Sequence, residues 1–592
     1  MHKKRAKAHI GLNMGPDQPL PYNEQYFDDA DSYVASLLDF AGHDDLLQTL
    51  CGGVHLLDFF TSDPDLYSKI LPLEWRDFFA QHEMTELLDL FMREDLEPLI
   101  KREANDQWRG GPLPPASLGD YLLHVRKHLL NRGMDVSQCK QNRTQKKLAR
   151  HVAVGMNVKK VHEVGLFADY LNRLASSINP SGHNITHLVD FGSGQNYLGR
   201  ALASEPYNRD IVAIESRVHN SERAKDFDVK ARIVEKQRVK RNKKSHRAGD
   251  QEPAVVAAPP RSEVAKAKWP EIQRKDAVQY VDHQIQDGDL SEVIARISTV
   301  TGRNNAEQGI MVISLHSCGN LIHHGLRSIV LNPSVNAVAM VGCCYNLLTE
   351  RLGPATYKLP ELRPTTHLHP RLRNGKANGE TNGATDGDPA GFPMSNRLAM
   401  SEVRLNITAR MMAVQAPQNW SEKDSQAFFV RHFYRALLQR VFLDYGVVRP
   451  PSPECAGGVS PAGHSSPGTP ITIGSLRKGC YESFVAYARG ALGKLCGDEA
   501  VNPELGRLIE ERMENMTDEV LNKYEDRFAG RKKDLSIIWS LMAFSAGVVE
   551  SVILVDRWLW LTEQAEVEEA WVEPVFEYGI SPRNLVVVGV KK

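Results

Sequence analysis

Two carboxylates that follow apolar runs, with a glycine-containing turn between them, are the residues of this chain best suited to bind a small molecule. Asp190 lies near the end of the apolar run 188–191 and precedes the turn Gly192-Ser193-Gly194. About twenty residues later a second apolar run ends in Glu215. Glycines let a ligand approach the backbone, and a carboxylate after the second strand can accept hydrogen bonds from ribose hydroxyls. This pattern predicts the first β-α-β unit of a nucleotide-binding sheet, although an ordinary strand–turn–helix remains the alternative.

The glycine turn is too short for a dinucleotide. Asn196 and Tyr197 stand where the third glycine of a dinucleotide fingerprint would fall. A D-x-G-x-G turn suits S-adenosylmethionine, which has no pyrophosphate to hold. We therefore predict that Gly192, Ser193 and Gly194 contact this cofactor. Asp190 is expected to orient the turn or to meet the ammonium group of the cofactor, directly or through water.

Three further apolar runs also end in polar groups. In chain order these ends are Asp282, His316-Ser317-Cys318-Gly319 and Gly342-Cys343-Cys344-Tyr345. Ligands of open parallel sheets bind beyond the carboxyl ends of the strands, so we expect all five strand ends to meet at one edge. Asp282 is predicted to accept a hydrogen bond from the adenine amino group. His316, Cys318 and Gly319 complete the predicted cofactor contacts.

Two of these residues are candidates for catalysis. His316 is the preferred general base, because the ordinary pKa of histidine lies near neutrality. A histidine that only orients its loop by hydrogen bonds is an equally good interpretation. Tyr345, at the end of the fifth strand, is the second candidate catalytic residue.

The cysteines near His316 raise the question of a metal. His316, Cys318, Cys343 and Cys344 are all residue types that bind zinc. Neighbouring residues of an extended strand point to opposite faces, however, and the spacing contains no C-x-x-C pair. We therefore predict no metal site. A cysteine nucleophile is also conceivable, but packing beneath the ligand is the commonest role of such thiols.

Composition limits the function classes. The 592 residues carry a formal net charge of −1, so any nucleic-acid surface must be local. Eight irregularly spaced cysteines favour a reducing compartment, and no apolar region follows the basic start, so we expect an intracellular protein, cytoplasmic or nuclear. The apolar run 537–555 contains Glu550, which favours a buried core helix over a membrane span.

The predicted fold class is α/β, with a mostly parallel, Rossmann-like sheet. Helical periodicity before the first strand indicates an N-terminal helical region, and a large helical insertion precedes a C-terminal antiparallel hairpin, expected over 575–579 and 584–590. The predicted divisions are a flexible start (1–24), an N-terminal helical domain (25–180), the sheet domain (181–350, with a disordered basic insertion at 228–268), a low-complexity loop (351–395), the helical insertion (396–565, disordered at 450–470) and the closing strands (566–592).

Several motifs of this chain resemble the methyltransferase-like protein 25 family, which overlaps the proteins called ribosomal RNA adenine dimethylase domain-containing. The motifs that carry the resemblance are 156–163, 190–194, 315–321, 341–348, 392–395, 555–557 and 581–585. The His316-Ser317-Cys318-Gly319 and double-cysteine elements also resemble a tRNA 2′-O-methyltransferase family, whose later histidine-rich part is replaced here by residues 345–348.

The resemblance implies a class I methyltransferase fold of the Rossmann-like type and the activity of an S-adenosylmethionine-dependent methyltransferase. RNA is the expected substrate class, through local basic stretches such as 223–247, and a protein substrate is the alternative. A non-catalytic cofactor-binding or scaffold protein of the same fold is the third possibility. Adenine dimethylation has little chemical support, because residues 316–319 replace the polar–proline–proline–aromatic motif that stacks a flipped adenine. The sequence predicts no particular oligomeric state.

Overall fold

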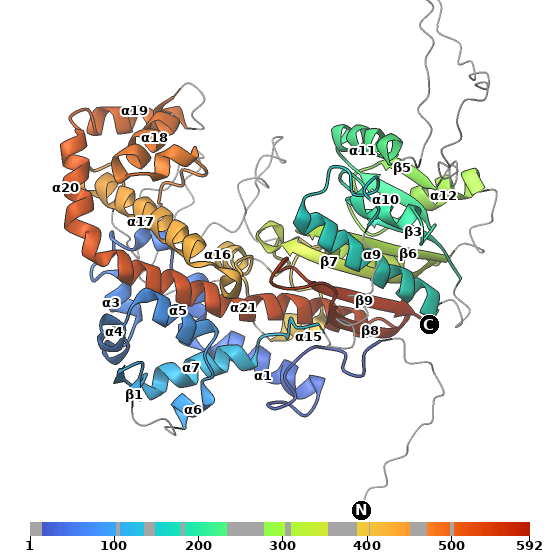
Figure 1. The fold of residues 1–592 in the computed structure, drawn as a ribbon, viewed down its shortest axis with the longest axis horizontal. Coiled ribbons are helices and arrows are strands. Elements are labelled where there is room, and N and C mark those ends of the chain that lie inside the picture. Colours follow the sequence, from blue (N-terminus) through green and yellow to red (C-terminus); the bar gives the residue numbers. More distant parts are fainter. Residues whose placement is uncertain are drawn as a thin grey trace, which may run out of the picture.

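A seven-stranded sheet and a helical body around one long helix make up the molecule (Figure 1). The computed structural model describes residues 15–101, 107–134, 148–178, 184–231, 233, 277–301, 309–352, 388–401, 403–449, 470–497 and 502–592. Most of the predicted basic insertion, the centre of the 351–395 loop, nearly all of 450–470 and the first part of 1–24 lie outside the described residues.

The strands of the sheet follow the order β5-β4-β3-β6-β7-β9-β8. Strands β3 to β7 are parallel, and β9 is antiparallel to both of its neighbours. From the β3/β6 boundary, the chain adds β4 and β5 on one side and β7 on the other. This boundary is therefore the topological switch point, where ligands bind in open α/β sheets. The strands of the sheet are β3 Ile185–Phe191, β4 Asp210–Glu215, β5 Val278–Asp282, β6 Gly309–Cys318, β7 Val335–Cys344, β8 Val567–Pro574 and β9 Leu585–Lys591.

Both faces of the sheet are covered, as its apolar strands require. Leu188 of β3 and Met311 of β6 belong to one hydrophobic core, whereas the next residues, Val189 and Val312, belong to the other. This alternation follows from the two-residue period of a strand. The helices of this part of the molecule are α9 Val158–Ile178, α10 Tyr197–Ala203, α11 Val218–Lys230, α12 Ser291–Thr301 and α13 Leu321–Leu331. Helices α9 and α10 contribute to the first core, and α12 and α13 to the second.

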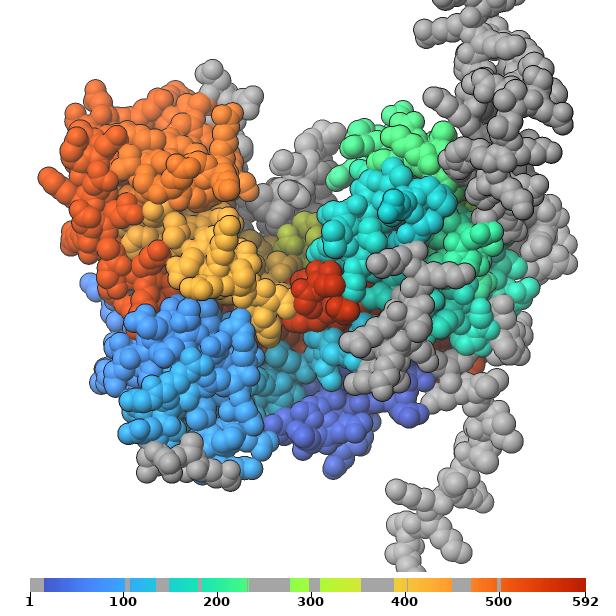
Figure 2. Space-filling view, viewed as in Figure 1, coloured from blue at the N-terminus to red at the C-terminus, as the bar shows by residue number. Residues whose placement is uncertain are grey.

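The second core continues into the helical body without a break. The central helix of that body, α21 (Lys532–Thr562), contacts helices from both ends of the chain and also β8. Figure 2 shows the blue N-terminal helices directly against the orange C-terminal ones. The N-terminal elements are α1 Ala30–His43, α2 Asp45–Gln48, α3 Leu66–Ile70, α4 Leu73–Ala80, α5 Met84–Met92, α6 Glu97–Ile100, β1 Gln107–Trp108, β2 Gly111–Pro112 and α7 Ala116–Lys127. The later ones are α15 Asn396–Met400, α16 Ile407–Met412, α17 Glu422–Asp444, α18 Phe484–Cys496, α19 Pro503–Arg512 and α20 Asp518–Phe528.

The structure corrects two of the predicted divisions, 25–180 and 396–565, and the position of one predicted strand. The ranges 25–180 and 396–565 share one hydrophobic core around α21. Helix α21 is apolar on every side and so needs cover all round, and helices from both ranges provide it. Helix α9, assigned to the N-terminal domain, packs on the sheet through Val164, Phe167 and Leu171. The first strand of the closing hairpin is β8, which precedes the predicted 575–579.

The apolar run of α21 is a core helix. Within the part of the chain that the structure describes, one helical stretch, Asp518–Thr562, is long and apolar enough to cross a membrane. Its most apolar window is 94% buried inside the protein. The expected interpretation of 537–555 as a buried core helix is therefore confirmed.

Candidate active site

The predicted glycine turn follows β3 and leaves an open space. Both glycines have positive φ, 67° at Gly192 and 56° at Gly194, a conformation that favours glycine. The turn is anchored to β4, because the N–H of Ser193 donates to the Ile214 carbonyl over 3.0 Å. A Cβ atom on Gly194 would meet nothing within 4 Å. The backbone is thus exposed to a ligand at this point.

Glu215 holds this turn from the end of β4. One of its carboxylate oxygens accepts the N–H of Gly194 and the other accepts the N–H of Arg217, each over 2.9 Å. Each carboxylate oxygen has a second lone pair, so these bonds leave acceptor capacity for ribose hydroxyls. The predicted ribose-binding role stays a prediction, and anchoring the turn is an additional role.

Asp190 is buried beside this pair of elements. Its side chain is almost inaccessible, and burial, together with the charge of Glu215, raises the pKa of Asp190 to about 8. A cationic ligand would lower this pKa again, because an opposite charge favours the carboxylate. A positive group next to Asp190 would therefore favour the charged form of its carboxyl.

The end of β5 lies where the sequence predicts it. Asp282 pairs in register with Glu215, is exposed, and accepts a hydrogen bond from the Ser221 hydroxyl over 2.7 Å. Its position beside Glu215 is compatible with the predicted adenine contact, which stays a prediction.

His316, near the end of β6, belongs to a polar cluster that the sequence analysis missed. Its Nε2 lies 3.0 Å from a carboxylate oxygen of Glu163, a residue of α9. Lys160 Nζ lies 2.7 Å from the same carboxylate, and the Ser581 hydroxyl donates to it over 2.6 Å. Burial raises the pKa of Glu163, but these partners, His316 first, outweigh it and hold the pKa at about 2. A carboxylate so placed fixes the orientation of the imidazole ring.

A signal for Glu163 was present in the chain. It belongs to the segment 156–163, which carried the family resemblance but received no role in the site. The helical pattern of α9 could not indicate that its first turns reach the end of β6, because that contact depends on how the helix packs.

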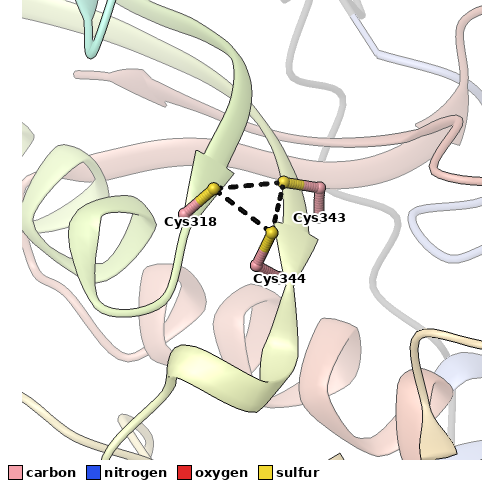
Figure 3. Close-up of side chains that lie close together, drawn as sticks. All are labelled: Cys318, Cys343 and Cys344. Carbon is pink, nitrogen blue, oxygen red and sulfur yellow. Dashed lines mark hydrogen bonds between the residues drawn. The ribbon is translucent and has the colours of Figure 1, made fainter. Parts of the chain in front are cut away.

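The three cysteines at the ends of β6 and β7 converge (Figure 3). The sulfur of Cys318 lies 3.5 Å from that of Cys343 and 3.3 Å from that of Cys344, and the latter two are 3.3 Å apart. The expectation that Cys343 and Cys344 point to opposite faces is wrong. The reason is local: Cys344 ends the strand with φ −104° and ψ 74°, which is not extended.

Gly319 lets these two strand ends approach each other. It has φ 57°, and a Cβ atom there would lie 2.5 Å from the carbonyl oxygen of Leu347. Its N–H donates to the carbonyl of Cys344 over 3.3 Å. The glycine is required by this close backbone contact, and its predicted contact with the cofactor remains a separate prediction.

Tyr345, the second candidate catalytic residue, is buried against α21. Its side chain is 2% exposed, and its hydroxyl donates to Glu550 of α21 over 2.7 Å. The guanidinium groups of Arg557 and Arg583 each lie 5.5 Å from its ring centre. A ring buried among these charges links the sheet to α21, so the structure favours a structural role over the predicted catalytic one.

Comparison with known proteins agrees with this geometry. Residues 159–351 match the family described as "Methyltransferase domain". The match begins in the first turn of α9, which agrees with the packing of α9 on the sheet.

Two curated relatives extend the comparison. The chain is 26% identical to "Probable methyltransferase-like protein 25" of Homo sapiens over 284 residues, and 26% identical to the Mus musculus protein of that name over 283 residues. Each alignment covers 48% of this chain and 37% of the relative. The resemblance predicted from the motifs is confirmed. No solved structure matches the chain.

Proposed function

We propose that residues 159–351 form a methyltransferase domain, which binds S-adenosylmethionine and transfers its methyl group to RNA. The observation that carries the cofactor assignment is the turn at Gly194, held by Glu215 and open to a ligand at the carboxyl edge of the sheet. The buried Asp190 beside it suits the cationic amino-acid part of the cofactor.

The bound cofactor would supply a methyl group on a positively charged sulfur, which an acceptor displaces in line. The chain would supply position: the glycine turn and the strand ends would hold the donor, and the Glu163–His316 pair lies near the end of β6, at the same edge of the sheet. Glu163 engages Nε2 of His316, which leaves Nδ1 as the ring nitrogen available to take a proton from an acceptor hydroxyl. Positioning alone can lower much of such a barrier.

Positive charge near the site supports an RNA acceptor. Lys159, at the start of α9, is half exposed and lies 3.8 Å from Glu163. Arg217 is exposed and lies close enough to Cys318 to act on it electrostatically. Both cations are available for phosphates. The Lys- and Arg-rich run 234–247 lies outside the described residues, and its contribution rests on the sequence.

Cofactor binding is tested by calorimetry on two glycine variants. Gly194→Val fills the open space over the turn and should abolish measurable S-adenosylmethionine binding. Gly493→Val is the matched control, because a Cβ atom at Gly493, in α18, also meets nothing within 4 Å but lies far from the sheet edge in the fold. Equal affinities in the wild type and both folded variants would refute the assignment.

The acceptor is tested with radiolabelled cofactor on total RNA and total protein. We expect label in RNA that nuclease removes and protease does not. Label retained after nuclease and lost to protease would instead identify a protein substrate. Cofactor binding without transfer to either pool would favour a non-catalytic protein.

A further inference from the structure

The ends of β6 and β7 bring three thiols to one point. Cys318 is exposed, and Cys343 and Cys344 are partly buried. Within the part of the chain that the structure describes, this is the one group of three or more His, Cys, Asp or Glu ligand atoms that lie within 4.8 Å of one another. Figure 3 shows the sulfur of Cys318 facing the two sulfurs of the neighbouring strand.

The spacing of the sulfurs suits one shared ion. The three separations, 3.3, 3.3 and 3.5 Å, form a nearly equilateral triangle whose centre is about 2.0 Å from each sulfur. With zinc–sulfur bonds of about 2.3 Å, an ion would stand roughly 1.2 Å out of this plane, as the apex of a pyramid does. Three ligands would then be in place and the fourth position of a tetrahedron would be open.

The same triangle argues against a disulfide. A disulfide joins two sulfurs at about 2.05 Å and leaves the third unpaired, whereas no pair here is closer than the others by more than a few tenths of an ångström. An iron–sulfur cluster is equally unsuitable, because its cysteines bind different iron atoms and lie farther apart.

Cationic side chains stand near the three thiols. Arg583 lies close enough to Cys344 to act on it electrostatically. Arg217 lies near Cys318 on the exposed side. Three thiolates on a divalent cation carry one net negative charge, which these groups can balance.

We propose that Cys318, Cys343 and Cys344 bind one zinc ion at the ends of β6 and β7. The ion joins the end of β6, which carries His316 and leads into Gly319, to the end of β7. Its open position faces the accessible side of Cys318, where water or a donor atom of the acceptor can bind. This site goes beyond the proposed function, because methyl transfer as argued above requires no metal. Zinc is the fitting ion, since it accepts tetrahedral sulfur ligands and has no redox chemistry.

Metal content and cobalt spectroscopy test the proposal on the full chain. Protein purified under reducing conditions without chelators should contain one equivalent of zinc by elemental analysis. Replacement by Co²⁺ should produce an intense thiolate-to-cobalt charge-transfer band together with the visible bands of tetrahedral cobalt. The cobalt measurement uses the wild-type protein and so does not depend on any variant's folding.

Serine variants locate the ligands. Cys318→Ser, Cys343→Ser and Cys344→Ser should each weaken zinc binding by at least about 100-fold, measured by competition with a chromophoric chelator. Cys480→Ser is the matched control, since Cys480 is a partly buried thiol of the helical body, and it should leave affinity unchanged. Wild-type protein with no zinc and no cobalt band, or with a disulfide among the three cysteines, would overturn the proposal. None of these assays uses a cofactor or an acceptor. A negative result would therefore count against the zinc site alone and not against the proposed methyltransferase function.

Discussion

Asp190 should couple cofactor binding to pH. Its pKa is raised from 3.8 to about 8 by burial and by the charge of Glu215. At pH 7 roughly one molecule in eleven then carries the carboxylate, so a cofactor that needs the charged form loses about 1.4 kcal/mol of binding free energy. We expect S-adenosylmethionine affinity to rise about tenfold between pH 7 and pH 9 and binding to release a proton.

Isothermal titration calorimetry measures both effects. Repeating the titration in buffers of different ionisation enthalpy reports the number of protons released. Asp190→Asn is the control, because the amide has the same shape and no charge to titrate. The cofactor's own titration affects both proteins equally, so the ratio of their affinities isolates Asp190.

Two results would refute this reasoning. A wild-type to Asp190→Asn affinity ratio that stays constant across the pH range would mean that Asp190 does not ionise on binding. Tighter binding to the wild type at low pH would mean that the protonated acid is the form the cofactor selects.

The raised pKa of Asp190 also predicts how the stability of the ligand-free protein depends on pH. A carboxyl whose pKa is raised by folding stabilises the protein below its unfolded pKa, here near 4, and this contribution is lost as the pH rises through about 8. Asp190→Asn should therefore raise the melting temperature more at pH 8.5 than at pH 5, by differential scanning calorimetry. An equal shift at both pH values would contradict the buried, uncharged state of Asp190.

Three further substitutions test the elements around the site. Glu163→Gln should lower the free energy of unfolding by about 2 kcal/mol at pH 7, measured by urea titration. Because folding lowers the pKa of Glu163, its carboxylate stabilises the protein above about pH 4.5, and this stabilisation is lost as the pH falls through about 2. The difference in unfolding free energy between variant and wild type should therefore become smaller in acid. Glu550→Ala leaves the buried Arg583 and the partly buried Arg132 without their shared carboxylate and should cost about 3–5 kcal/mol. The control Glu511→Ala, an exposed residue of α19, should cost under about 1 kcal/mol. Gly319→Ala should lower the melting temperature by several degrees, because its Cβ atom would collide with a carbonyl oxygen, and Gly493→Ala should not.

The strand ends were predictable because their signals are local. An apolar run that ends in a carboxylate or in glycine defines where a strand stops, and a parallel sheet brings such ends together whatever its exact order. Asp190, Glu215 and Asp282 therefore lie where expected, with Glu215 and Asp282 in register on adjacent strands. Asp282 did so despite the long segment that separates β4 from β5 in the sequence.

The cysteine geometry was not predictable in the same way. Opposite side-chain directions follow only if the strand stays extended to its last residue, and Cys344 leaves that conformation. The position of Cys318 depends in addition on register shifts between β6 and β7 near their ends. These local departures from regular strand geometry together brought the three thiols to one point.

By itself, the sequence determined the parallel sheet, the glycine turn and the order of polar groups along its edge, because a strand's two-residue period and a glycine's positive φ act within a few residues. Only the tertiary structure decided which distant groups meet. It brought Glu163 to His316 and enclosed α21 with helices from both ends of the chain, because burial of an apolar surface is non-directional and does not specify which partner covers it.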